Sequence, residues 1–346
     1  MLATWVRYST ICPKVNSIRV KGENMKKIVS KTVQFWRIVD RKSGDPYPKD
    51  IDWHVIVGGL TTKYTTTIDG RDVTGRAYNF SRDAINELKN NCPIPNNPGL
   101  SPNGVMGLVI AAEKDHIPNQ QDGRSGQQAP VQMNTGWDAV DNSFIWHLPF
   151  GNMFAYVAES QSSIQPNKYA AWLTKYWRNK TPQGKPVDFM AVPVLDEDVI
   201  NKMKKAKGLR SLVLRTRVGK HSIAKNPVAT MFSKHDSYTN VQIETKISFG
   251  HAKGSEADEK KILDVLNDNL GYLSEFSKLQ ANVIDVGGNT TEIDLLKQRV
   301  TRKRDITFSN PSANAITMEP NSVFMALAEA FNKDAKLLDK LKNSGR

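Results

Sequence analysis

The sequence predicts an α+β fold with mixed or antiparallel sheets, flanking helices, two domains and a C-terminal helix. Segments of strand length, rich in β-branched and aromatic residues, recur from residue 32 to residue 308. A few amphipathic segments of helix length interrupt them, and the last apolar repeat is helical. Strands in long runs, instead of strict strand–helix alternation, favour α+β over a doubly wound parallel sheet.

The first half is predicted to be mostly β. Ser81 is a typical N-cap for a short helix over 81–91, which ends before Pro93. The polar stretch 116–130, rich in Gly, Gln and Pro, predicts a loop. Strands are predicted at 32–39, 53–57, 61–67, 105–111, 131–135, 144–148 and 153–159.

The second half contains the longer helices. Tyr169, Trp172, Leu173 and Tyr176 recur at helical spacing, which predicts a helix over 166–178 with an aromatic face in the core. The remaining predicted helices are 196–207, stopped by Gly208, 256–270 and the terminal helix 321–341. Strands are predicted at 187–195, 209–218, 239–249, 279–286, 291–296 and 299–308.

Three segments are expected along the chain. Residues 1–24 carry four basic residues and no apolar core of a signal peptide, and Met25-Lys26-Lys27 is typical of a bacterial start. We therefore expect 1–24 to be a leader or cloning-derived segment. An N-terminal α+β domain over 25–160 and a basic C-terminal α+β domain over 161–346 are expected to follow.

Composition restricts the function classes. The chain of 346 residues carries 48 Lys and Arg against 35 Asp and Glu, a net charge of +13, which favours a polyanionic partner. Two cysteines cannot build a disulfide framework, and six scattered histidines do not show zinc-site spacing. No apolar run reaches 18 residues, so no spanning helix is expected. The sequence predicts a cytoplasmic protein without a metal or other cofactor.

The positive charge is concentrated in one segment. Val199–His235 contains ten lysines and arginines and no acidic residue, and a second cluster lies at 297–304. Such surfaces suit phosphates, although acids at a helix start and lysines at its end also match the helix dipole. A solvated charged face without a ligand therefore remains an alternative. The predicted nucleic-acid-binding residues are Lys202, Lys204, Lys205, Lys207, Arg210, Arg215, Arg217, Lys220, Lys225, Arg299, Arg302 and Arg304.

Two short motifs offer alternatives. Asp285-Val-Gly-Gly-Asn289 is similar to a phosphate loop of actin-like ATPases and sugar kinases, but its position near the chain end favours a plain hairpin. Glu244-Thr-Lys246 on a strand, with Asp236 upstream, matches half of a magnesium-dependent nuclease site, although a cross-strand ion pair is the commoner explanation. Other catalytic motifs are absent, so no catalytic residue is assigned and a non-enzymatic role is favoured.

Three segments of the C-terminal half carry a resemblance to a known family. They are the strand Thr239–Lys246, the helix segment Lys261–Leu266, and the pattern from Gly288 through Thr291-Glu292 to Leu295. In these segments the chain resembles the RexA-type phage-exclusion proteins of lambdoid prophages. The resemblance implies a dimeric, two-domain cytoplasmic protein. It also implies binding of double-stranded DNA without marked sequence preference, and a part in abortive infection.

Charge and resemblance agree on one hypothesis: a sequence-nonspecific, double-stranded-DNA-binding protein of anti-phage defence, acting as a homodimer. A membrane or ATPase defence partner is a further possibility, and no small-molecule substrate is predicted. Two alternatives remain open: a nuclease using Asp236, Glu244 and Lys246, or a basic protein-interaction module. The terminal helix 321–341 could serve the homodimer or pack onto its own domain.

Overall fold

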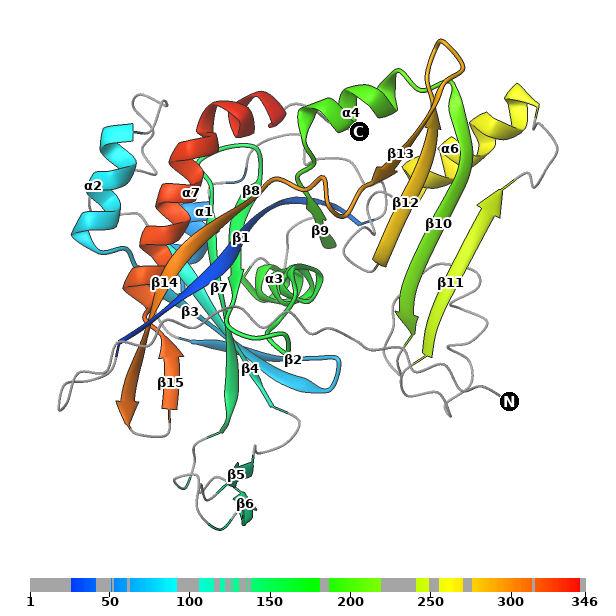
Figure 1. Ribbon diagram of the computed structural model, residues 1–346. Helices are drawn as coiled ribbons and strands as arrows, with labels where there is room; N and C mark the ends of the chain where they lie inside the picture. Colours follow the sequence, from blue (N-terminus) through cyan, green and yellow to red (C-terminus); the bar gives the residue numbers. More distant parts are fainter. Residues whose placement is uncertain are drawn as a thin grey trace.

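The computed structural model contains two antiparallel sheets with helices packed against them (Figure 1). This confirms the predicted α+β class and C-terminal helix. The described residues are 26–41, 51, 53–60, 63–91, 106–114, 119–121, 125, 127–130, 135, 138–180, 187–218, 241–248, 255–269, 276–312 and 315–342. The predicted segment 1–24 lies outside them.

The larger sheet has nine strands in the order β15-β14-β1-β8-β7-β4-β3-β2, with β9 also paired to β1. All its printed pairings are antiparallel. Its strands are β1 (Lys27–Asp40), β2 (Tyr64–Ile68), β3 (Arg71–Asn79), β4 (Met106–Glu113), β7 (Val140–His147), β8 (Met153–Ala158), β9 (Phe189–Pro193), β14 (Thr301–Ser312) and β15 (Ala315–Met318).

Helices cover both faces of this sheet because its central strands are apolar on both sides. Alternate residues of β1 point to opposite faces: Phe35 enters one core and Trp36 the other. On one face lie α2 (Arg82–Asn91) and α7 (Pro320–Leu341), which pack side by side (Figure 1). On the other lie α1 (Trp53–Gly58) and α3 (Pro166–Lys180). The result is a three-layer arrangement.

The smaller sheet has four strands in the order β11-β10-β12-β13, again all antiparallel. Leu212, Leu214 and Leu279 point to the face that α6 covers, and α4 joins the same core. The opposite face carries polar and charged side chains. The elements are α4 (Glu197–Lys204), β10 (Gly208–Val218), β11 (Val241–Ser248), α6 (Glu256–Asn269), β12 (Phe276–Ile284) and β13 (Thr290–Asp294).

The predicted boundary near residue 160 does not separate the two sheets. β9, β14 and β15 follow that boundary in the chain but pair within the larger sheet: β9 and β14 pair with β1, and β15 pairs with β14. The smaller sheet is therefore an insertion between β9 and β14. An isolated antiparallel β-bridge between Leu195 and Arg299 joins the two ends of this insertion.

Most predicted elements are observed, and the exceptions are informative. The predicted strand at 53–57 is wrong, because these residues form α1, and 61–67 contributes β2, which pairs with β3. β3 and β15 were not predicted. The predicted loop 116–130 contains a small hairpin of β5 (Asn119–Gln121) and β6 (Gln128–Pro130). Apart from Thr135, the predicted strand 131–135 lies outside the described residues.

The terminal helix packs onto its own chain. Phe324, Leu327, Phe331, Leu338 and Leu341 are all buried against the larger sheet, which favours intramolecular packing over a helix-mediated dimer. In the described ranges, no helix is both long enough and apolar enough to cross a bilayer.

Candidate nucleic-acid interface

The junction between α4 and β10 gathers exposed cations on a rigid support. Asp196 is the N-cap of α4, and its carboxylate accepts a hydrogen bond of 3.0 Å from the Asp198 N–H. The helix ends at Lys205, whose N–H donates to the Asn201 carbonyl over 3.1 Å. Acids at the start and lysines at the end both match the helix dipole. The sequence therefore places Lys202 and Lys205 at the helix end, where both side chains are exposed.

A β-bulge then displays Arg210. The register of β10 against β12 shifts between Leu209 and Ser211, so Arg210 is the extra residue and its side chain is exposed. Gly208, just before it, permits the close approach of α6. A Cβ at Gly208 would lie 2.7 Å from the Glu259 Cβ and 2.8 Å from its carbonyl carbon.

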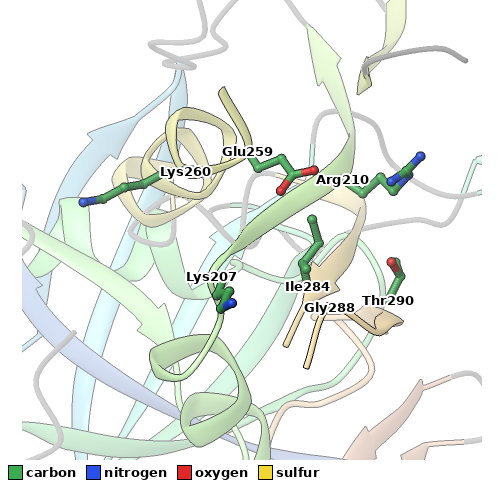
Figure 2. Close-up of a pocket in the computed structure, with 7 residues that line it drawn as sticks. All are labelled: Lys207, Arg210, Glu259, Lys260, Ile284, Gly288 and Thr290. Atoms are coloured by element: carbon green, nitrogen blue, oxygen red, sulfur yellow. The ribbon is translucent and has the colours of Figure 1, made fainter. Parts of the chain in front are cut away.

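The bulge, α6 and the β12–β13 turn enclose a hollow of about 450 Å³ (Figure 2). Its charged lining residues are Lys207, Arg210, Lys260 and Glu259, so cations outnumber the single carboxylate. Figure 2 shows the Lys260 side chain leaving α6 on the side away from Arg210. The other lining residues are Ile284, Gly288 and Thr290.

We call Lys202, Lys205, Lys207, Arg210 and Lys260 the α4–β10 corner. Among the described residues, no hydrogen bond or ion pair engages any of these five side chains. Lys260 was missed by sequence reasoning because it lies on a helix in which acidic residues outnumber the two lysines, and only the packing of α6 brings it to the hollow.

Of the remaining predicted residues of the basic segment, Arg215 has a protein partner. Arg215 lies opposite Glu244 on β11, and its Nε donates to the Glu244 Oε2 over 2.6 Å. Lys204 and Arg217 belong to α4 and β10, and Lys220 and Lys225 lie outside the described residues.

The three predicted arginines of the second cluster lie in β14 or just before it, and each has a protein partner. Arg302 pairs with the buried Asp334 of α7, and Arg304 lies 3.5 Å from the Glu329 carboxylate. The Arg299 Nε donates to the Leu296 carbonyl over 2.7 Å, and burial lowers the pKa of Arg299. Arg302 and Arg304 fasten β14 to α7. Their geometry therefore does not support the prediction that they contact phosphates.

Glu244, the candidate nuclease carboxylate, also has ion-pair partners within the protein. Glu244 binds Arg215, and the Lys278 Nζ lies 4.0 Å from the Glu244 Oε2, so two cations balance its charge. This is the cross-strand ion pair that the sequence favoured. Asp236 lies outside the described residues, and within the described part no three His, Cys, Asp or Glu side chains gather as metal ligands.

The Asp285 side chain stabilises the turn between β12 and β13. Its carboxylate accepts hydrogen bonds from the backbone N–H of Asn289, over 2.9 Å, and from the Asn289 amide, over 3.2 Å. These bonds lower the pKa of Asp285. Gly288 has φ +81°, the left-handed conformation that a tight hairpin needs and that favours glycine. The Gly-Gly motif is therefore a hairpin, as predicted, and the Asp285 carboxylate is used within it.

Comparison with known proteins places the chain in a family but attaches no activity to it. Residues 156–337, just over half of the chain, match a family of unknown function (DUF6731), so the chain belongs to that family. The matched segment runs from β8 into α7 and includes the whole smaller sheet. No curated protein matches the chain.

Proposed function

We propose that this protein binds double-stranded DNA without sequence preference, through phosphate contacts from the α4–β10 corner. The observation that carries the proposal is the set of five exposed cations that have no partner among the described residues, displayed by a helix end, a bulge and α6. Salt-dependent phosphate contacts supply most sequence-independent DNA affinity, and they position a protein without reading bases.

The support for duplex over single-stranded nucleic acid comes from the aromatic residues. Binding of single strands relies on exposed aromatic rings on which bases stack. Tyr169, Trp172 and Tyr176 of α3 are buried in the core of the larger sheet, as the sequence predicted. The large apolar side chains that are exposed in the described part are Ile28, Val140 and Val286, none of them aromatic.

The salt dependence of binding tests the proposal. Five phosphate contacts correspond to a slope of log Kobs against log salt of about −4.5, or about 500-fold weaker binding at 200 mM than at 50 mM salt. The variant Lys207→Glu/Arg210→Glu leaves three contacts, for which the slope is about −2.7 and the loss about 40-fold. Fluorescence anisotropy with a labelled random duplex measures both.

Lys303→Glu/Lys336→Glu is the matched control. It changes the net charge by the same amount, at two exposed lysines of β14 and α7. We expect this control to keep the wild-type slope. Equal slopes for the two double variants, or no duplex binding at low salt, would refute the proposal. Binding to heparin without binding to DNA would instead favour an acidic protein partner.

We further propose a role in phage exclusion, which rests on the RexA resemblance alone. Cells that express the wild-type chain should lower phage plating efficiency, and the Lys207→Glu/Arg210→Glu variant should lose this effect. Equal protection by both proteins would separate defence from DNA binding. Equal plating with and without the protein would reject the defence role.

A further inference from the structure

The outer edge of β11 is an open pairing surface on the smaller sheet. β11 is an end strand of that sheet, and in the described part of the chain no strand pairs with its outer side. With eight residues, it is longer than the other end strands β2, β13 and β15, which have five, five and four. Long open edges favour pairing with another strand.

The sequence of β11 is complementary to itself when it runs antiparallel. With Thr245 placed opposite Thr245 of a second copy, Glu244 faces Lys246 and Ile243 faces Ile247, on both sides of the centre. Opposite charges at directly opposed positions stabilise antiparallel pairs, whereas like charges destabilise them. Gln242 faces Ser248, so seven residues take part.

Neighbouring registers lack this match. Centring on Glu244 places two carboxylates directly opposite each other, and centring on Lys246 opposes two ammonium groups. Lys246, which is exposed, has no partner within the described residues. The Glu244 carboxylate can accept a further donor besides Arg215 and the more distant Lys278, because a carboxylate has about four acceptor sites.

We propose that β11 pairs with β11 of a second copy of this chain, antiparallel about a two-fold axis at Thr245. The two smaller sheets then form one continuous eight-stranded sheet. Both copies of α6 lie on the same face of it, because equivalent residues of the two strands point the same way. This inference does not depend on the proposed DNA binding, since its test contains no nucleic acid.

Cysteine crosslinking in the full-length chain tests the register. In a background with Cys12 and Cys92 changed to serine, Thr245→Cys places two cysteine Cα atoms about 4.5–5.5 Å apart across the axis, within disulfide range. We expect an oxidant to give a covalent dimer. Ile243→Cys and Ile247→Cys alone should not crosslink, because identical positions lie about 14 Å apart along the strands. A mixture of these two variants should crosslink.

Sedimentation equilibrium supplies the second readout. The wild-type chain should reach twice the mass of one chain as concentration rises. Thr245→Lys, which opposes two ammonium groups at the axis, should raise the dimer dissociation constant at least about fivefold. Circular dichroism should show that this variant stays folded. A monomer at all concentrations, or a dimer that Thr245→Cys does not trap, would overturn the proposal.

Discussion

Removing Arg302 should destabilise the fold without weakening the proposed phosphate binding. Asp334 is 5% exposed and Arg302 32%, so Arg302→Met leaves a buried carboxylate with its main partner gone. Removing one member of a buried ion pair costs about 3–5 kcal/mol. Because water partly reaches Arg302, we expect the lower end, about 3 kcal/mol at pH 7. For a chain of 346 residues the melting temperature should fall by about 4 °C.

The pH dependence of the stability loss shows whether the unpaired Asp334 carboxylate causes it. Burial raises the pKa of Asp334, and the guanidinium of Arg302 opposes that rise without cancelling it. In Arg302→Met the largest part of that opposition is gone, although Lys333 and Arg304 remain, so the folded-state pKa lies further above the unfolded value of about 3.9. A raised carboxyl pKa contributes stability at low pH, and that stability is lost as the pH rises through the folded pKa. The deficit of Arg302→Met should therefore be small near pH 4 and full at pH 7.

Urea denaturation of three proteins measures these effects. At pH 7, Arg302→Met/Asp334→Asn should recover most of the stability that Arg302→Met loses, because no carboxylate is buried. Duplex affinity of folded Arg302→Met, measured well below its melting temperature, should stay within about twofold of wild type, as expected without a phosphate contact. If Arg302→Met is as stable as wild type at pH 7, or the double variant is no better than the single one, the structural role assigned to Arg302 is wrong.

Two further perturbations test the packing and electrostatics of the larger sheet. A Cβ at Gly107 would lie 2.0 Å from the Phe324 Cε1, so Gly107→Ala should displace α7 and cost about 1–3 kcal/mol, measured as a shift of the urea midpoint. Burial raises the pKa of Asp141, but hydrogen bonds from Ser162, Ser160 and Lys114 outweigh it and leave that pKa below its usual value. Ionised Asp141 should therefore contribute stability above about pH 3.9 that is lost as the pH falls through the folded pKa. Asp141→Asn should flatten the unfolding free energy between pH 2 and 5, and an unchanged acid profile would contradict this.

Local patterns predicted the elements whose structure is determined locally. The aromatic repeat of α3 and the apolar stripe of α7 have helical spacing, and both faces are buried as predicted. The Gly-Gly-Asn turn between β12 and β13 specifies its own hairpin, since Gly288 adopts a positive φ and Asp285 binds Asn289. In each case the information lies within a few residues of the element.

Local sequence patterns did not predict elements whose structure depends on contacts with residues far along the chain. Residues 53–57 form an apolar β-branched run, which periodicity alone cannot separate from a buried helix. Here Trp53 stacks on His147 at 4.2 Å, and its indole donates to Asn152, so contacts from β7 and the β7–β8 turn accompany helix α1. β3 was missed because Gly75 interrupts its pattern, and a Cβ there would lie 2.2 Å from Trp172 of α3.

The same distinction separates the two basic clusters of the sequence. Charge counts alone treat Arg302 and Arg210 alike, since each belongs to a stretch rich in lysine and arginine. The difference lies in partners from distant segments: α7 brings Asp334 to Arg302, whereas Arg210 has no ion-pair partner among the described residues, and α6 adds another cation, Lys260, to the lining of the same hollow. A lysine or arginine contributes to polyanion binding only when the fold leaves its charge uncompensated. Net charge therefore favours one class of partner, a polyanion, which stays a prediction. Tertiary pairing decides which lysines and arginines have a charge left to meet it.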